Sequence, residues 1–330
     1  MRDLVPPHEA SRALSPPDLA SLRVGGVGID YVTRFESGVA GPDVVINALC
    51  HGNEICGAIA VERLIRLGLK PRRGRLTLVL ANVAACLRFD PQRPLASRYV
   101  EQDFNRLWSE AVLDGCGTSV ELRRARELRP IYRQADVLLD LHSMTNPCEA
   151  LALCGDTGRA RALALALGFP RWVVSDPGHA AGRRLIEYGA FGIPDHETPA
   201  GAGAPVALLV ECGQHGQPAA ADVAFAMCLR VLGHFGLIAS STLARLLPPL
   251  ASGPQRVVDV TDVVTASGDN FVFAADYAGL DVVPRAGTII GYDQGWPVRT
   301  PHDDCILIMP ARRVRRGQTA VRLGRIVACA

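Results

Sequence analysis

The chain has 330 residues, of which 48% are hydrophobic and 21% charged, and its formal net charge is +2. This composition is that of a globular protein with room for one large domain and a small one. No basic block or aromatic-rich stripe indicates a nucleic-acid partner, and no apolar run approaches the length of a membrane span.

The amino-terminal segment and the cysteines both bear on the compartment. Residues 1–17 carry prolines and charges where a signal peptide would have an apolar run. The ten cysteines are scattered without a Cys-x-x-Cys pair, so we expect reduced thiols. These features predict a cytoplasmic protein without a membrane partner. A homo-oligomer is compatible with them, but the oligomeric state stays open.

Short apolar runs alternate with amphipathic stretches from about residue 43 to about residue 238. The predicted strands cover residues 44–49, 76–81, 137–141, 150–154, 172–175 and 206–210. The predicted helices cover residues 54–67, 120–134, 158–167, 181–188 and 220–235. This alternation predicts an α/β fold with a mostly parallel sheet that helices cover on both faces.

The pattern changes after the pair Pro248-Pro249. Short β-branched runs broken by glycine and proline follow, at residues 257–264, 270–274, 287–292, 306–309 and 325–328. They are typical of a small β-sandwich or barrel. We therefore expect a catalytic domain over residues 1–245 and a small β-domain over residues 246–330. A lipoyl-type carrier function is excluded because the only lysine of the chain, Lys70, lies outside the small domain.

Two motifs at predicted strand ends carry candidate metal ligands. His51-Gly52-Asn53-Glu54 follows the first apolar run, and residues three apart lie on one face of a helical turn. His142 follows a later apolar run in Asp140-Leu141-His142-Ser143. Strand carboxyl ends meet at one edge of a parallel sheet. Two histidines and one glutamate form a catalytic zinc set with a position left open for water or substrate. We predict one Zn²⁺ per chain on His51, Glu54 and His142.

A further acid and an arginine-rich segment complete the candidate site. Glu211 follows the apolar run 206–210, where it can act as general base and then as proton donor to a leaving amine. In the segment 98–106, Arg106 can bind a substrate carboxylate through two parallel hydrogen bonds, supported by the Asn105 amide. Arg98 can face a developing oxyanion, and Asp103 can orient an arginine or a metal-binding histidine.

Together these motifs resemble the succinylglutamate desuccinylase/aspartoacylase family of zinc carboxypeptidase-like hydrolases. The residues that carry the resemblance are His51-Gly52-Asn53-Glu54, Asp103-Phe104-Asn105-Arg106, Asp140-Leu141-His142 and Glu211. The resemblance spans about residues 40–330. It implies zinc on the two histidines and Glu54, Glu211 as the base, and Arg98, Asn105 and Arg106 as substrate contacts. It also implies a carboxy-terminal β-domain that partly covers the mouth of the site.

The chain departs from that family in the loop 195–203, which lacks the arginine and tyrosine that contact substrate in aspartoacylases. This departure argues against aspartate as the released amino acid. His196 and His215 are additional candidates for substrate contact, and Tyr292 is a loose candidate for the distal tyrosine of the family.

The leading hypothesis is zinc-dependent hydrolysis of a small N-acyl amino acid. A metallocarboxypeptidase acting on short peptides uses the same ligand set, and a zinc-binding protein without activity is the alternative from another class. A serine hydrolase is excluded because the chain has no Gly-x-Ser-x-Gly sequence. Neither the acyl group nor the amine follows from these residues.

Overall fold

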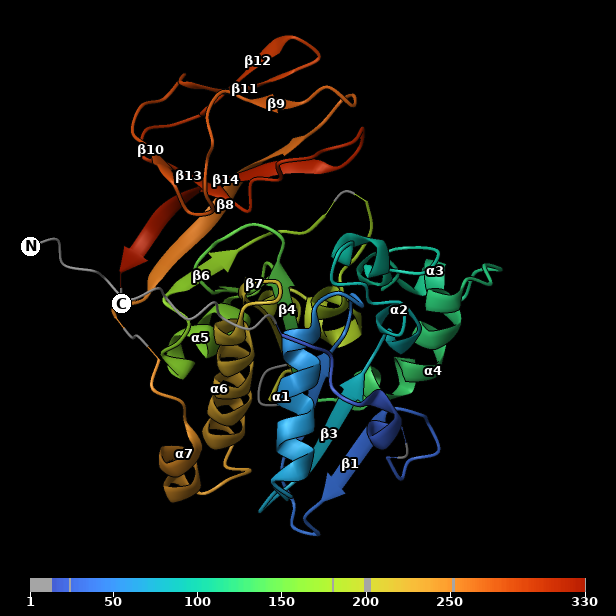
Figure 1. Ribbon diagram of the computed structural model, residues 1–330. Helices are drawn as coiled ribbons and strands as arrows, with labels where there is room; N and C mark the ends of the chain where they lie inside the picture. The colour runs from blue at the N-terminus through green and yellow to red at the C-terminus, as the bar shows by residue number, and fades with distance from the viewer. Residues whose placement is uncertain (1–13, 24, 180, 199–202, 251–252, 330) are drawn as a thin grey trace, which may run out of the picture.

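A computed structural model describes residues 14–23, 25–179, 181–198, 203–250 and 253–329 (Figure 1). Residues 1–13 of the amino-terminal segment and residues 199–202 of the loop after His196 lie outside this part of the chain. Predictions that rest on them are therefore not addressed by the structure. Within the described residues, no helix is long and apolar enough to cross a membrane.

One large sheet forms the framework of the molecule. Its strand order over the described residues is β1-β3-β2-β4-β7-β5-β6-β8-β14-β13-β10. Neighbouring strands are parallel from β3 through β2 and β4 to β7, and again from β5 through β6 to β8. The strands of this half are β1 (Val32–Glu36), β2 (Asp43–Ala48), β3 (Arg75–Leu80), β4 (Val137–Met144), β5 (Leu151–Leu153), β6 (Trp172–Ser175) and β7 (Val206–Gln214).

Helices cover both faces of this sheet, because its strands are apolar on both sides. Val44 and Ile46 of β2 belong to one buried cluster, whereas Val45 belongs to the other. The first cluster includes side chains of α1, α5 and α6, and the second includes side chains of α4. The helices are α1 (Ile55–Arg66), α2 (Val83–Cys86), α3 (Glu110–Leu113), α4 (Val120–Gln134), α5 (Gly158–Leu167), α6 (Pro218–His234) and α7 (Ser240–Leu246).

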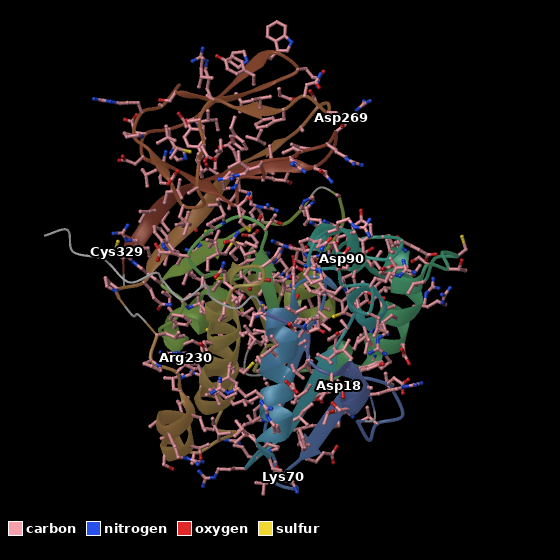
Figure 2. The ribbon with its side chains drawn as sticks, in the orientation of Figure 1. Asp18, Lys70, Asp90, Arg230, Asp269 and Cys329 are labelled. Atoms are coloured by element: carbon pink, nitrogen blue, oxygen red, sulfur yellow. The ribbon has the colours of Figure 1, made fainter. Side chains whose placement is uncertain are left out.

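The carboxy-terminal residues form short strands, as predicted, and these strands pair antiparallel with one another. The strands are β8 (Arg256–Thr265), β9 (Val272–Phe273), β10 (Val282–Val283), β11 (Ile289–Asp293), β12 (Trp296–Arg299), β13 (Cys305–Ile308) and β14 (Thr319–Cys329). β9, β11 and β12 make a separate three-stranded sheet. Figure 2 shows Asp269 in this part and Lys70 at the opposite end of the molecule. The α/β fold with a mostly parallel central sheet and a carboxy-terminal antiparallel region is confirmed.

The first strand of the carboxy-terminal part also belongs to the central sheet. The beginning of β8 pairs in parallel with β6, with Val173 opposite Val257, and the other edge of β8 pairs antiparallel with β14 from Arg256 to Thr265. The large sheet therefore runs without a break from the α/β half into the carboxy-terminal strands. The division of the chain near residue 245 stays a prediction.

The helix predicted at residues 181–188 is wrong. The structure has only a short 3-10 turn, η4 (Leu185–Glu187), in this segment. Gly182 has a φ of 138°, which ends any helical path. The Arg184 side chain donates hydrogen bonds to the carboxylates of both Glu187 and Asp176. Apolar spacing favoured the helix, but these polar contacts fix an irregular segment beside the site.

Candidate functional site

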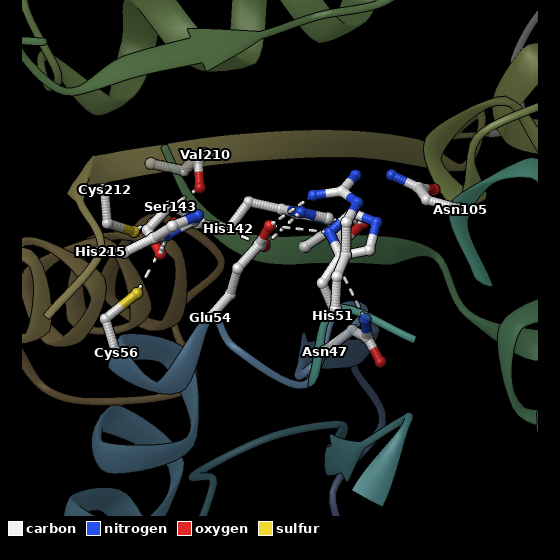
Figure 3. A network of polar contacts seen from close by, with 12 residues as sticks. Asn47, His51, Glu54, Cys56, Asn105, His142, Ser143, Val210, Cys212 and His215 are labelled. Atoms are coloured by element: carbon white, nitrogen blue, oxygen red, sulfur yellow. Dashed lines mark hydrogen bonds and ion pairs between the residues drawn. The ribbon is translucent and has the colours of Figure 1, made fainter. Parts of the chain in front are cut away.

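Three side chains converge at the carboxyl ends of β2 and β4 (Figure 3). His51 follows β2, Glu54 immediately precedes α1, and His142 lies in β4. The His51 Nδ1 atom is 2.8 Å from Glu54 Oε1, and the His142 Nδ1 atom is 2.8 Å from Glu54 Oε2. One ligand atom from each residue lies within 4.8 Å of the others, and all three residues are buried. The group is a candidate metal centre.

The second nitrogen of each histidine contacts a carboxylate. His51 Nε2 lies 3.0 Å from Asp103 Oδ1, and His142 Nε2 lies 2.9 Å from Asp140 Oδ2. A carboxylate at Nε2 fixes the proton there and leaves Nδ1 as the electron-pair donor. Both Nδ1 atoms face Glu54. The donor set of two imidazole nitrogens and one carboxylate therefore fits a catalytic zinc ion.

A buried chain of hydrogen bonds holds Asp140 in turn. The Asn47 Nδ2 amide donates to Asp140 Oδ1 at 2.7 Å, and the Tyr132 hydroxyl donates to Asn47 Oδ1 at 2.7 Å. β2 and β4 place Asn47 opposite Asp140 in register. The strand pairing that builds the sheet thus also orients His142.

Gly52 is required because two other segments of the backbone pass close to it. It does not have a positive φ. A Cβ atom there would lie 2.4 Å from the backbone of Ala85 and Cys86 and 2.5 Å from the Ser97 carbonyl oxygen. Its amide donates to the Arg98 carbonyl at 3.1 Å. The missing side chain lets the segment with Arg98 approach the metal centre.

Glu211 lies beside the metal centre on β7, where its register partner is His142 of β4. Its Oε2 atom is buried and has no hydrogen-bond partner among the described residues. Burial and the nearby charge of Glu54 raise the pKa of Glu211 to about 8, although His142 and Arg98 oppose the shift. A carboxyl group with this pKa can both accept and return a proton near neutral pH.

Arg98 lies within the same polar cluster. Its Nη1 atom is 3.5 Å from Glu54 Oε1, and its Nη2 atom is 3.2 Å from Asp103 Oδ2. Asp103 therefore contacts both Arg98 and His51, and its role as an orienting residue stays a prediction. The Arg98 side chain as a whole is 30% exposed.

Asn105 and Arg106 are placed beside this cluster but differ in their contacts. The Asn105 Oδ1 atom accepts a hydrogen bond from the Leu185 amide at 2.8 Å. The oxygen of this side chain therefore fixes the segment around Leu185. Only its amide nitrogen is left for a substrate. Arg106 donates to the Asn105 carbonyl at 2.7 Å and has no ion pair among the described residues. Burial, together with neighbouring arginines, lowers the pKa of Arg106 although Asp103 opposes the shift.

The sequence interpretation missed Glu121, which holds the segment 98–106 in place. Glu121 is fully buried in the first turn of α4. Its carboxylate accepts from the consecutive amides of Val100, Glu101 and Gln102 at 2.5, 3.1 and 3.3 Å, and from Asn82 at 3.2 Å. The only signal in the sequence is an acidic residue after the helix cap Ser119, and this is common on solvated helices.

A buried ion-pair cluster next to Arg106 was also missed. Asp176 is fully buried between Arg184, at 2.8 Å, and Arg322 of β14, at 2.7 Å. Arg184 also pairs with Glu187. No spacing in the sequence indicates this cluster, because its members come from segments that only the fold brings together.

The three additional candidates for substrate contact differ in position. His215 Nδ1 lies 2.8 Å from the Ser143 hydroxyl, next to His142, and burial with nearby Arg98 lowers its pKa to about 4. His196 is solvated, with its side chain 81% exposed. Tyr292 is 42% exposed in β11, whose sheet lies far from β4 and β7 in Figure 1. Of the three, only His215 borders the site.

Cys50, Asp140 and His142 form a second group with ligand-like spacing. Burial raises the pKa of Cys50 to about 12, and Asp140 adds to this shift. A thiol held protonated is a poor metal ligand. Asp140 is also engaged by Asn47 and His142. This group therefore supports His142 instead of forming a second metal centre.

Residues 40–174 match the family model of the Succinylglutamate desuccinylase/Aspartoacylase catalytic domain. All three candidate metal ligands lie in this segment, whereas Glu211 lies beyond it. The resemblance stated from the motifs is thereby confirmed. No curated protein matches the chain.

Several solved structures share the fold over most of the chain. The succinylglutamate desuccinylase of Vibrio parahaemolyticus is 19% identical, with 90% of this chain and 86% of that chain covered and a TM-score of 0.64. A putative succinylglutamate desuccinylase/aspartoacylase of Shewanella frigidimarina is 19% identical, with 91% and 94% covered and a TM-score of 0.64. A product-bound ectoine utilization protein, EutE (DoeB), of Ruegeria pomeroyi is 17% identical, with 92% of each chain covered and a TM-score of 0.60. At these identities the similarity shows the fold alone.

Proposed function

Because residues 40–174 are those of a succinylglutamate desuccinylase/aspartoacylase family catalytic domain, we propose that this protein is a zinc-dependent deacylase of small N-acyl amino acids. The observation that supports this most directly is Glu211 beside two histidines whose Nδ1 atoms face one carboxylate. A site that only binds metal does not need, besides its three ligands, a carboxyl group whose pKa lies near neutral pH.

His51, Glu54 and His142 would hold one zinc ion per chain. When bound, zinc polarises the amide carbonyl of the substrate and lowers the pKa of water. Asp103 and Asp140 keep the two imidazoles in the required tautomer. Three protein ligands leave room for water and substrate, so Glu211 is not needed as a fourth.

Glu211 has the proton-transfer role in this proposal. It takes a proton from the attacking water and returns it to the nitrogen that leaves, so that a carboxylic acid and an amine are released. Its position on a buried strand keeps the carboxyl group fixed, and its raised pKa suits both halves of this transfer.

Arg98 and Arg106 bind the charged parts of the substrate in this proposal. Arg98, one-third exposed beside Glu54, faces the oxyanion that forms at the carbonyl carbon. Arg106, without an ion pair among the described residues, binds the α-carboxylate of the amino acid, and the Asn105 amide nitrogen supports it. The cytoplasmic location and a homo-oligomeric state stay predictions from the sequence.

A substrate screen tests this proposal. Purified zinc-loaded protein is incubated with N-acetyl and N-succinyl amino acids, and both the free acid and the free amine are measured. We expect release of both products in equal amounts from at least one compound. Glu211→Gln should keep one zinc per chain while kcat falls by about two to four orders of magnitude. Full activity of this variant, or release of terminal amino acids from peptides only, would contradict the proposal.

A further inference from the structure

Asp176 joins three parts of the chain through one buried carboxylate. It follows directly after β6 and is fully buried. Its Oδ2 atom lies 2.8 Å from Nη1 of Arg184, in the segment 182–187, and 2.7 Å from Nε of Arg322 in β14. Its Oδ1 atom accepts a hydrogen bond from the Gly178 amide at 3.1 Å. Both oxygens of this carboxylate are thereby engaged within the protein.

Arg184 extends this connection into the turn η4. Besides the Asp176 carboxylate, its guanidinium contacts the Asp176 carbonyl oxygen at 2.9 Å and Glu187 Oε1 at 2.8 Å. The Arg184 backbone amide also donates to Glu187 Oε2 at 2.9 Å. A planar guanidinium with donors in several directions can hold two carboxylates and a carbonyl at fixed angles. The shape of η4 therefore depends on the contact between Arg184 and Asp176.

The turn η4 in turn holds the side chain of Asn105. The amide of Leu185, the first residue of η4, donates to Asn105 Oδ1 at 2.8 Å. Asn105 is only 3% exposed. Because its oxygen is bound to η4, its amide nitrogen is the end that remains for a substrate. A displacement of η4 would therefore change the orientation of Asn105.

The same segment packs against the backbone of Arg106. A Cβ atom on Gly182 would lie 2.4 Å from the Arg106 carbonyl oxygen and 3.0 Å from the Arg106 Cβ atom. Leu107, the next residue, forms a parallel bridge with Arg183. The two stretches of backbone are thus in direct contact, and Arg106 cannot keep its place if the segment 182–187 moves.

The charge of Asp176 also bears on Arg106. Burial lowers the pKa of Arg106, and the charges of nearby arginines lower it further, among them Arg184 and Arg322. At both of these arginines, Asp176 is the strongest charge that counters the effect of burial on the pKa. Without this carboxylate, the repulsion that Arg106 experiences would increase.

Apolar side chains often stabilise a protein as well as a buried ion pair does, whereas an ion pair fixes the direction of its members. We infer that Asp176 is a positioning residue of the proposed substrate site. Through Arg184 and η4, it fixes the segment that binds the substrate carboxylate. Through Arg322, it makes this arrangement depend on β14. The inference rests on the proposed function, in which Asn105 and Arg106 bind the carboxylate of the amino acid.

Asp176→Asn tests this inference, because it removes the charge and keeps the size of the side chain. At least one guanidinium then faces an amide group, and η4 is released. On the best N-acyl amino acid of the substrate screen, we expect KM to rise by about 10- to 100-fold while kcat changes little. On the decarboxylated analogue of that compound, kcat/KM should be the same in the variant and the wild-type protein. An equal loss on both compounds would mean a general structural role and would overturn the inference.

Asp259→Asn is the matched control. Asp259 lies in β8 and pairs with Arg161 of α5, so it also joins the carboxy-terminal strands to the α/β half. It has no contact with the segment 182–187 among the described residues. KM of this variant should equal that of the wild-type protein. A rise in KM as large as that in Asp176→Asn would show that the effect is not specific to Asp176.

A double-variant cycle tests the path through Arg184. Arg184→Lys keeps a positive charge but lacks the planar fork that contacts both Asp176 and Glu187. It should raise KM about as much as Asp176→Asn does, and the double variant should be little worse than either single variant. Additive effects would contradict the path from Asp176 through Arg184. Thermal melting establishes that each variant is folded, and Arg184→Lys keeps the inference testable if Asp176→Asn does not fold.

Hydrogen exchange at the Leu185 amide separates failure of this inference from failure of the proposed function, because it requires no substrate. Leu185 donates to Asn105 Oδ1, so its exchange reports how often η4 moves away from Asn105. By NMR, we expect exchange at least about 10-fold faster in Asp176→Asn and unchanged in Asp259→Asn. If no N-acyl amino acid is hydrolysed, the deacylase proposal fails, and the exchange rate still decides whether Asp176 fixes η4. Exchange at the wild-type rate in folded Asp176→Asn would overturn the inference.

Discussion

Asp140 fixes the tautomer of His142, and this contact can be tested with one substitution. In Asp140→Asn, the Asn47 amide still donates to the oxygen of the new side chain, so the new amide nitrogen must face His142 Nε2. Because the new amide group is a donor, His142 Nε2 must accept and can carry no proton. The imidazole proton then moves to His142 Nδ1, where the metal would bind. We expect zinc affinity to fall by about 10- to 100-fold with the fold retained.

Competition with a chromogenic chelator measures this affinity. Asp222→Asn is a suitable control, because Asp222 is an exposed carboxylate whose single ion pair within the described part of the chain is with Arg63. An affinity of Asp140→Asn equal to that of the control would show that Asp140 does not orient the ligand.

Glu211 gives the protein a stability that depends on pH. Its pKa is raised from 4.5 to about 8 in the folded protein, so folding favours the protonated carboxyl group. The resulting stability is fully present below pH 4.5 and is lost as the pH rises through about 8. Glu211→Gln cannot ionise. In chelator-treated protein, the Tm of this variant relative to wild type should therefore rise between pH 5 and pH 8.5.

Differential scanning fluorimetry over that range provides the measurement. Saturating zinc should reduce the effect, because the cation offsets the charge of Glu54 that raises the pKa of Glu211. If the difference in Tm between Glu211→Gln and the wild-type protein is the same at pH 5 and at pH 8.5, Glu211 is ionised in the folded protein over the whole range.

At the scale of elements, the first turn of α4 positions the segment that carries Arg98, Asp103 and Arg106. The fully buried Glu121 carboxylate accepts hydrogen bonds from three consecutive backbone amides of this segment. Glu121→Gln would turn an amide group toward backbone donors and leave at least one of them unpaired. We expect a loss of roughly 3 kcal/mol in the free energy of unfolding, together with a higher KM, because Arg106 is no longer held in place.

Urea denaturation and steady-state kinetics measure the two effects. Glu127→Gln on the same helix is the control, since the Glu127 side chain is 46% exposed and forms its ion pair with Arg124 from the solvent side. Exposed ion pairs of this kind contribute about 0–1 kcal/mol. If both variants behave alike, the three amides do not depend on Glu121.

At the scale of the whole molecule, the continuous sheet bears on how the chain unfolds. β8 pairs with β6 through Val257 and Val258, which belong to the two clusters of the α/β half. Separating residues 256–329 would expose these side chains and the open edge of β6. We therefore expect the α/β half and the carboxy-terminal strands to unfold together.

Hydrogen exchange at increasing urea concentration can compare peptides from β4 and β13. Equal midpoints for the two peptides would indicate one cooperative unit. Different midpoints would instead support two domains divided near residue 245.

The sequence by itself determined which segments form the main strands and where the candidate metal-ligand motifs lie. Parallel strands are largely apolar, so the apolar runs are visible in the sequence, and His51, His142 and Glu211 stand out as the polar residues that follow them. The strands β4 and β7 continue past His142 and Glu211, to Met144 and Gln214. Strands β1, β10 and β12 were not predicted. They are short or partly exposed, and such strands lack a continuous apolar run.

Only the tertiary structure decided which polar residues support the site. Glu121 resembles any acidic residue at a helix start, and Asp176, Arg184 and Arg322 come from a loop and a distant strand. Charged side chains have no periodicity that distinguishes a buried partner from a solvated one. Their role depends on which segments meet, and here the folding of β14 against the α/β half brings Arg322 to the carboxylate that Arg184 also contacts.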